Sequence, residues 1–296
     1  MKKSVFRRKR TYTLIVLFIL TIVYLIMHFG ISFSPDDDAL IAEYKAKGIE
    51  LNIQEKAYKS ISYKYYYTGI DSTKSTILLF VHGTPGAGAM FGKFMADKDL
   101  LKKADIISVD RFGYGSSDFG TSYPILIDQA QQLNHLCSQF PDRKIIAVGH
   151  SFGGPIVVKQ ACEFPEDLSA LILLAPALDP ETEKFEGLAK LAWWKLTSWY
   201  FPQLLKVAAD EKIAHRNELE IMKDDLKDIA IPILHIHGTN DWMVPYQNLQ
   251  FAEEEFKSAD LTPITLEGSS HFLFTGEDFE KVKVEILKFL ERDEFK

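Results

Sequence analysis

Cysteine is scarce in this sequence, with only Cys137 and Cys162 among 296 residues. Two cysteines make no disulfide framework, and neither stands at a spacing typical of metal ligands. Both fall in segments with helical patterns, so we interpret them as buried free thiols. A disulfide between them is the alternative in an oxidising compartment.

Basic charge is scarce beyond the first ten residues. MKKSVFRRKR carries six basic residues and no acid, and the remainder has 28 basic and 41 acidic residues, a net charge of −13. An acidic body argues against nucleic acid as a partner. Repeats and low-complexity segments are also missing. The length and the ordinary hydrophobic content of 47% fit one large α/β domain or two small ones.

Charge is absent altogether from residues 11–35, a run of 25. About 20 apolar residues suffice for a membrane-spanning helix, and basic residues precede the run. We therefore predict a cytoplasmic tip (1–10), a transmembrane anchor (11–33), a linker helix (34–48) and an extracytoplasmic domain (49–296), periplasmic or extracellular. A cleaved signal peptide is the alternative. We favour the anchor, because no A-x-A-like site follows and Pro35 would sit badly after a cut at Ser34.

Strand-like and helical patterns alternate from Thr76 onward, which predicts a mostly parallel sheet covered by helices on both faces. We predict helices at 36–48, 90–96, 124–140, 154–164, 246–258 and 278–295, and eight strands at 50–53, 60–68, 76–81, 104–109, 144–148, 170–174, 231–235 and 262–266. Residues 176–229 interrupt the alternation with helical patterns only, and we interpret them as a helical cap. Functional groups are expected in the loops at the carboxyl ends of the strands.

The stretch AVGHSFGGP, residues 147–155, places Ser151 two positions from Gly149 and from Gly153. An apolar strand pattern precedes it and a helical pattern follows. This context is typical of a nucleophile elbow, a tight strand-to-helix turn that projects a serine hydroxyl above the sheet.

A nucleophilic serine needs a base and an acid that orients the base. The loop after the seventh predicted strand offers Asp241, and the loop after the eighth offers His271. Asp179, after the sixth strand, is a weaker rival for the acid. Two N–H donors are needed for the oxyanion, and we assign them to Phe152, after the serine, and to Thr84 in the loop VHGTPGAG.

Five segments resemble the α/β-hydrolase superfamily: HGTPG at 82–86, DRFGYGSS at 110–117, GHSFGG at 149–154, GTNDWMVP at 238–245 and GSSHF at 268–272. The order Ser151, Asp241, His271 is also that of the family. The resemblance implies an eight-stranded sheet with an antiparallel second strand, and a serine nucleophile. Related branches that open epoxides or cleave carbon–halogen bonds carry aspartate at the elbow, so Ser151 argues against both.

The remaining histidines and the aromatic residues of the cap complete the candidates. We interpret His82 and His150 as structural, His235 and His237 as a packed strand end rather than a zinc pair, and His135 and His215 as solvated. Residues 187–205 are rich in aromatic residues. We favour packing of this segment on the core, with Leu188, Leu191 and Leu196 covering it, over an acyl pocket or a membrane surface. Candidate pocket residues are His82, Trp194, Trp199, Trp242 and Phe272.

The sequence therefore predicts a membrane-anchored serine carboxylesterase that needs no metal or organic cofactor. Its expected partner is a small-molecule or lipid-like ester, and its oligomeric state stays open. HGTPG is similar to the HGGPG of proline iminopeptidases, whose cap acids could correspond to Glu181, Glu183 and Glu186. The sequence is also compatible with a carbon–carbon bond hydrolase and with a catalytically silent binding or scaffold protein.

Overall fold

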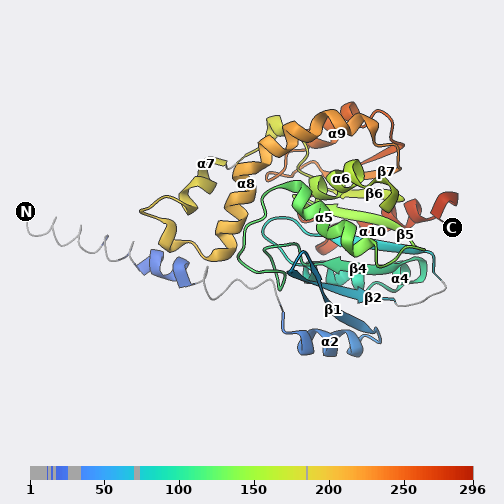
Figure 1. Cartoon of the computed structure of the whole chain (residues 1–296), viewed down its shortest axis with the longest axis horizontal. Coiled ribbons are helices and arrows are strands. Elements are labelled where there is room, and N and C mark those ends of the chain that lie inside the picture. Colours follow the sequence, from blue (N-terminus) through green and yellow to red (C-terminus); the bar gives the residue numbers. More distant parts are fainter. Residues whose placement is uncertain are drawn as a thin grey trace, which may run out of the picture.

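An eight-stranded sheet organises the computed structural model, which describes residues 12, 15, 18–25, 35–69, 74–184 and 186–295 (Figure 1). The strands run in the order β1-β2-β4-β3-β5-β6-β7-β8. β2 is antiparallel to both of its neighbours, and the pairs from β4 to β8 are parallel. The strands are β1 (Leu51–Tyr58), β2 (Ile61–Thr68), β3 (Thr76–Val81), β4 (Asp105–Val109), β5 (Lys144–His150), β6 (Ala170–Leu174), β7 (Ile233–Gly238) and β8 (Leu261–Leu266).

Helices cover the sheet on both faces, which explains the continuous apolar strands in the sequence. In β3 the side chains of Ile77 and Leu79 enter one core, and those of Leu78 and Phe80 enter the other. Helices α5 (Leu126–Cys137), α6 (Gly153–Glu163) and α9 (Gln247–Glu255) pack on the first core. The second core is closed by α2 (Asp37–Ala46), α3 (Gly92–Met95), α4 (Lys98–Lys103) and α10 (Gly276–Leu290).

The predicted fold, an α/β-hydrolase sheet with an antiparallel second strand, is confirmed. The first strand is longer than predicted, because β1 and β2 form a hairpin whose turn residues, Lys59 and Ser60, have φ of 47° and 69°. Such turns usually contain glycine or asparagine, so the sequence gives no turn signal at this place. Helix α4 was also not predicted. It begins after Asp97, whose carboxylate accepts hydrogen bonds from the N–H groups of Asp99 and Leu100.

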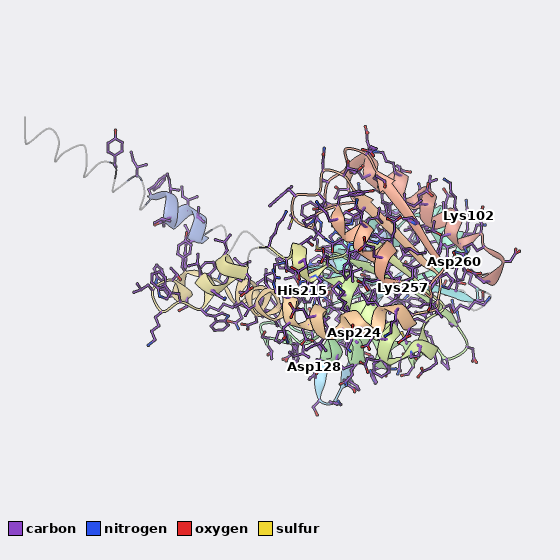
Figure 2. All side chains as sticks on the ribbon, turned by 90° about the horizontal axis from the view of Figure 1, so that it is seen from above. Lys102, Asp128, His215, Asp224, Lys257 and Asp260 are labelled. Atoms are coloured by element: carbon purple, nitrogen blue, oxygen red, sulfur yellow. The ribbon has the colours of Figure 1, made fainter. Side chains whose placement is uncertain are left out.

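The described part of the predicted cap between β6 and β7 consists of helices and loops and contains no strand. The main ones are α7 (Glu186–Ala189) and the long α8 (Gln203–Met222), with short 3₁₀ turns at 180–182, 190–192, 198–200 and 223–228. The tip of the cap projects away from the sheet, and the helical residues 18–25 lie beside it in both views (Figures 1 and 2). The Tyr200 hydroxyl donates to the Leu20 carbonyl at 2.7 Å, and the Tyr24 ring contacts the rings of Trp199 and Tyr200.

Most of the predicted anchor lies outside the described residues, and so does the basic tip. In the part of the chain that the structure describes, no helix combines the length and hydropathy needed to cross a bilayer. The two cysteines are unpaired thiols, as interpreted from the sequence, and Cys137 Sγ accepts a hydrogen bond from Gln160.

Candidate active site

Ser151 occupies a strained turn between β5 and α6. Its φ is +54°, in the left-handed region of the backbone that residues other than glycine rarely adopt. A Cβ on Gly149 would lie 2.5 Å from the Gly153 carbonyl oxygen, and one on Gly153 would lie 2.2 Å from that of Val81. Both positions therefore require glycine. This is the local geometry of the predicted elbow.

Asp241 and His271 form a hydrogen-bonded pair on the loops after β7 and β8. His271 Nδ1 lies 2.7 Å from Asp241 Oδ2. The other carboxylate oxygen, Oδ1, accepts from the backbone N–H groups of Met243 and Val244, at 2.9 Å each. Because Nδ1 faces the carboxylate, Nε2 of His271 is left for the nucleophile. Asp179, the rival acid, instead caps the short helix at 180–182.

Burial and hydrogen bonding shift the pKa of Asp241 in opposite directions. Desolvation raises the pKa of this carboxyl, but the hydrogen bond to His271, the charge of His271 and the nearby His237 outweigh it and lower the pKa. Asp241 is therefore ionised at neutral pH, as the acid of such a pair must be to stabilise an imidazolium.

A second histidine contact joins the His271 loop to the elbow. His150, which precedes Ser151, has its Nε2 3.0 Å from the His271 carbonyl oxygen, and the two rings lie 4.8 Å apart. Burial, with the nearby charge of His271, lowers the pKa of His150 to about 3. A neutral His150 donates Nε2–H to that carbonyl and so fixes the base beside the nucleophile.

The other strand-end histidines are also buried. His237 Nε2 lies 3.1 Å from the Val244 carbonyl oxygen and 3.6 Å from Asp241 Oδ2, and its Nδ1 lies 3.2 Å from His235 Nε2. Among the described residues no three His, Cys, Asp or Glu side chains are grouped so that they could hold a metal ion.

Thr84 and Phe152, the predicted oxyanion donors, both line the cavity that Ser151 borders. Phe152 directly precedes α6, and Thr84 follows β3. The intervening Gly83 packs against the nucleophile, since a Cβ there would lie 2.8 Å from Ser151 Cβ. The Thr84 hydroxyl donates to Glu211 and accepts from Arg111 at 2.8 Å. Its side chain is therefore held by these groups, while its backbone borders the cavity.

A fully buried ion pair under this loop was missed by the sequence reasoning. Arg111, after β4, donates to Glu211 of α8 at 2.7 Å, and both side chains are 0% exposed. Arg111 also donates to the carbonyl oxygens of His82 and Gly83, and the Tyr114 hydroxyl donates to Glu211 at 2.7 Å. The only sequence signal was the motif DRFGYGSS, because nothing marks Glu211 among the many acids of the cap.

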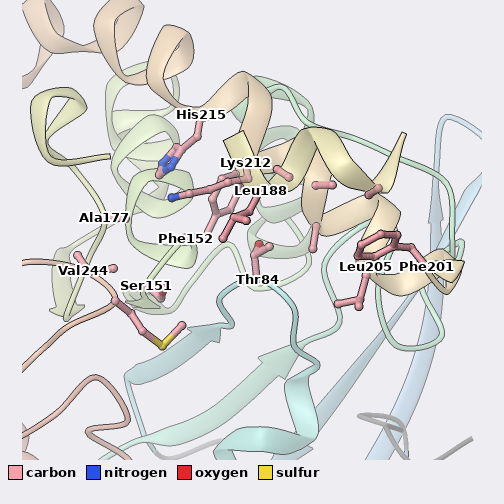
Figure 3. Close-up of a pocket in the computed structure, with 15 residues that line it drawn as sticks. Thr84, Ser151, Phe152, Ala177, Leu188, Phe201, Leu205, Lys212, His215 and Val244 are labelled. Atoms are coloured by element: carbon pink, nitrogen blue, oxygen red, sulfur yellow. The ribbon is translucent and has the colours of Figure 1, made fainter. Parts of the chain in front are cut away.

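A mostly apolar cavity of about 280 Å³ lies between the cap and the elbow (Figure 3). None of the five predicted pocket residues lines it. Trp194, Trp199, Trp242 and Phe272 are between 43% and 68% exposed, and His82 is buried beneath Arg111. The lining residues are Thr84, Ser151, Phe152, Ala177, Leu188, Ala189, Ala192, Phe201, Leu205, Ala208, Ala209, Lys212, His215, Met243 and Val244.

The structure also corrects two interpretations of the cap. Leu188, Leu191 and Leu196 are 39–68% exposed and do not cover the core, because the tip projects beyond the sheet. His215 is not solvated. It is 1% exposed, and its ring packs on that of Phe152, with the centroids 4.6 Å apart. The helical pattern could not reveal which face of α8 meets the sheet domain.

Comparisons with known proteins agree with this fold. A sequence model of the alpha/beta hydrolase fold matches residues 76–214. Monoglyceride lipase of Rattus norvegicus is 23% identical over 231 residues, 66% of this chain and 75% of that protein. A proline iminopeptidase of Saccharolobus solfataricus is 30% identical over 135 residues, 43% of this chain and 42% of its own length.

A solved structure is similar over nearly the whole chain. The crystal structure of a membrane phospholipase A, described as a novel bacterial virulence factor, matches with a TM-score of 0.61 and 17% identity. The match covers 96% of this chain and 99% of that one, and identity at this level bears on the fold alone. The family model and the structural neighbour both indicate the α/β-hydrolase fold for this chain.

Proposed function

We propose that this chain is a serine hydrolase that cleaves carboxylic esters with an apolar acyl group. The observation that carries the proposal is the 2.7 Å pair of His271 and Asp241 beside an elbow serine, Ser151, at the wall of a mostly apolar cavity. The similarity to monoglyceride lipase supports the same reaction class.

In the first half-reaction, Ser151 Oγ attacks the ester carbonyl carbon while Nε2 of His271 takes the hydroxyl proton. Asp241 stays ionised and stabilises the imidazolium. The N–H groups of Thr84 and Phe152 receive the negative charge of the tetrahedral intermediate. The C–O bond then breaks, His271 gives its proton to the departing alcohol, and the acyl group remains on Ser151.

In the second half-reaction, water attacks the acyl-enzyme with His271 again as the base. The same two N–H groups stabilise the second oxyanion. Collapse returns the proton to Ser151 and releases the carboxylic acid. Apart from this water and the substrate, every group used in these steps belongs to the chain.

The cap acids argue against a peptidase that holds a free amine. Glu183 pairs with Lys212 and contacts His215, and Glu186 pairs with Lys190. Their charges are thereby balanced within the cap, and none of the residues lining the cavity is acidic. An ammonium group in the cavity would meet Lys212 instead, so an ester fits better than an aminoacyl amide.

The proposal is tested by labelling the full-length protein with a fluorophosphonate probe. Labelling should disappear in Ser151→Ala and in His271→Ala, while Ser138→Ala, at an exposed helix end, should label like the wild type. Thermal unfolding of each variant verifies that it is folded. Labelling that survives Ser151→Ala contradicts the assignment of Ser151 as the nucleophile. A folded wild type that does not label contradicts the proposal and favours a binding or scaffold role.

We also propose that residues 11–33 anchor the chain in a membrane, with the N-terminus cytoplasmic and the catalytic domain outside. The support is the run of 25 uncharged residues after six basic ones.

A further inference from the structure

One face of α8 forms a wall of the cavity, and this face is apolar at one end and polar at the other. Residues 205, 208, 209, 212 and 215 line the cavity and recur at spacings of three or four, so they lie on one face of the helix. The first three are Leu205, Ala208 and Ala209, and the last two are Lys212 and His215. They span about 15 Å at 1.5 Å per residue. The cavity therefore has an apolar end and a polar end.

The polar end lies next to the nucleophile. The His215 ring packs on Phe152, the residue after Ser151, with the centroids 4.6 Å apart. Figure 3 shows the nitrogens of His215 and Lys212 on the Ser151 side of the cavity, with Phe201 and Leu205 at the far side of Thr84. Figure 2 places His215 where the cap meets the sheet domain. An acyl chain fits the apolar end, which leaves the polar end for the alcohol part of an ester.

His215 has unused hydrogen-bonding capacity. It is 1% exposed, and among the described residues neither ring nitrogen has a hydrogen-bond partner. Its Nδ1 lies 3.1 Å from Glu183 Oε1, away from the direction of a ring N–H bond. A buried polar group without a partner is costly, so its presence on a cavity wall points to a ligand group that satisfies it.

The charges of Glu183 and Lys212, next to His215, indicate which kind of ligand group would pair with it. Burial raises the pKa of Glu183, but the contacts of His215 and Lys212 outweigh it and lower the pKa, so this carboxylate is ionised and only accepts. Nδ1 of His215 faces this carboxylate, so Nε2 is the ring nitrogen left for a ligand. Lys212, which pairs with Glu183, is a donor. A hydroxyl group complements both side chains, because it accepts from the ammonium of Lys212 and pairs with Nε2 of His215 whether that nitrogen carries a proton or not.

We propose that His215 and Lys212 form a subsite for a free hydroxyl on the alcohol part of the substrate, so that the preferred substrates are partial esters of a polyol. The inference rests on the proposed ester hydrolysis, since it assigns the alcohol side of that same cavity. Deacylation is unaffected by this subsite, because the alcohol has left by then.

The test compares two esters that share the acyl chain and the length of the alcohol, 2,3-dihydroxypropyl butanoate and propyl butanoate. We expect the full-length wild type to favour the dihydroxypropyl ester in kcat/KM by roughly tenfold, the effect of one or two new hydrogen bonds. His215→Asn should bring this ratio near one. His215→Gln should keep part of it, because a glutamine amide reaches about as far as Nε2. Asn217→Ala, exposed on the same helix, should retain the wild-type ratio and rates.

The outcomes separate the two proposals. A wild type that hydrolyses both esters equally, or a ratio that His215→Asn leaves unchanged, overturns the hydroxyl subsite while ester hydrolysis stands. A larger gain with 2-carboxyethyl butanoate than with the dihydroxypropyl ester also overturns it, in favour of an anion site at Lys212. If the folded protein hydrolyses none of these esters and does not label at Ser151, both proposals fail.

Discussion

At the scale of single residues, the candidate site depends on protonation states that burial and hydrogen bonding set. The backbone N–H groups of Met243 and Val244 hold one oxygen of Asp241, so the other oxygen is directed at His271 Nδ1. An uncharged amide at this position could turn its NH₂ group toward Nδ1 and stabilise the wrong tautomer of the base.

Asp241→Asn should therefore lower kcat for ester hydrolysis by about 10³- to 10⁴-fold with little change in KM. Steady-state kinetics on a soluble butanoate ester measure both constants. Asp179→Asn is the matched control, since that side chain caps a short helix. If the control loses activity and Asp241→Asn does not, the acid has been assigned to the wrong loop.

His150 gives a prediction about stability and pH. Its folded pKa is lowered to about 3 from 6.5, first by burial and then by the charge of His271. Below pH 6.5 the unfolded chain binds a proton here that the folded chain does not, so stability is lost as the pH falls toward 3. In His150→Gln this loss should be smaller by up to about 1.4 kcal/mol per pH unit. Urea unfolding between about pH 7.5 and 4.5 measures the two slopes, and equal slopes would contradict the assignment of a neutral His150.

At the scale of elements, the sequence predicted the strands with continuous apolar patterns and the turn that glycines flank. The apolar runs of β3 to β6, the elbow around Ser151 and the order of Asp241 and His271 all follow from local patterns. The hairpin turn at Lys59 and Ser60 did not, because its positive φ values are imposed by strand pairing rather than by residue type. The cavity wall was also missed, since the conspicuous tryptophans of the cap lie on its outer surface.

The ion pair of Arg111 and Glu211 joins helix α8 to the loop after β3, which holds Thr84. Glu211→Gln would leave the Arg111 guanidinium buried without a counter-charge, which should reduce the free energy of unfolding by about 3–5 kcal/mol. Glu220→Gln, exposed on the same helix, should change it by less than about 0.5 kcal/mol. Urea denaturation compares them. A similarly small decrease in the free energy of unfolding in both variants would show that the ion pair does not stabilise the position of the cap.

At the scale of the whole molecule, residues 18–25 and the tip of the cap lie side by side and project from the sheet domain (Figures 1 and 2). Residues 18–25 contact Tyr200 and Trp199, and the tip exposes several large apolar side chains around them (Figure 2). If residues 11–33 anchor the chain as proposed, the exposed apolar side chains of the cap tip lie on the side of the molecule that faces the membrane.

Alkaline carbonate washing tests the anchor. The full-length chain should stay in the membrane pellet, and a chain that begins at residue 35 should move to the supernatant with its fluorophosphonate labelling intact. Cleavage of the catalytic domain by protease added outside intact cells would support the proposed orientation. Release of the full-length chain by carbonate would refute the anchor, and a mature N-terminus near residue 35 would favour the signal peptide.

Glu211 belongs to the cap by its place in the sequence but to the catalytic loop by its contacts. A chimera that replaced residues 176–229 with the corresponding segment of a relative would remove the only described carboxylate on Arg111, together with an acceptor of the Thr84 hydroxyl. The cap is therefore not an interchangeable cassette. Successful exchange of substrate preference between such proteins should require that the arginine, the threonine and the cap glutamate be transferred as a unit.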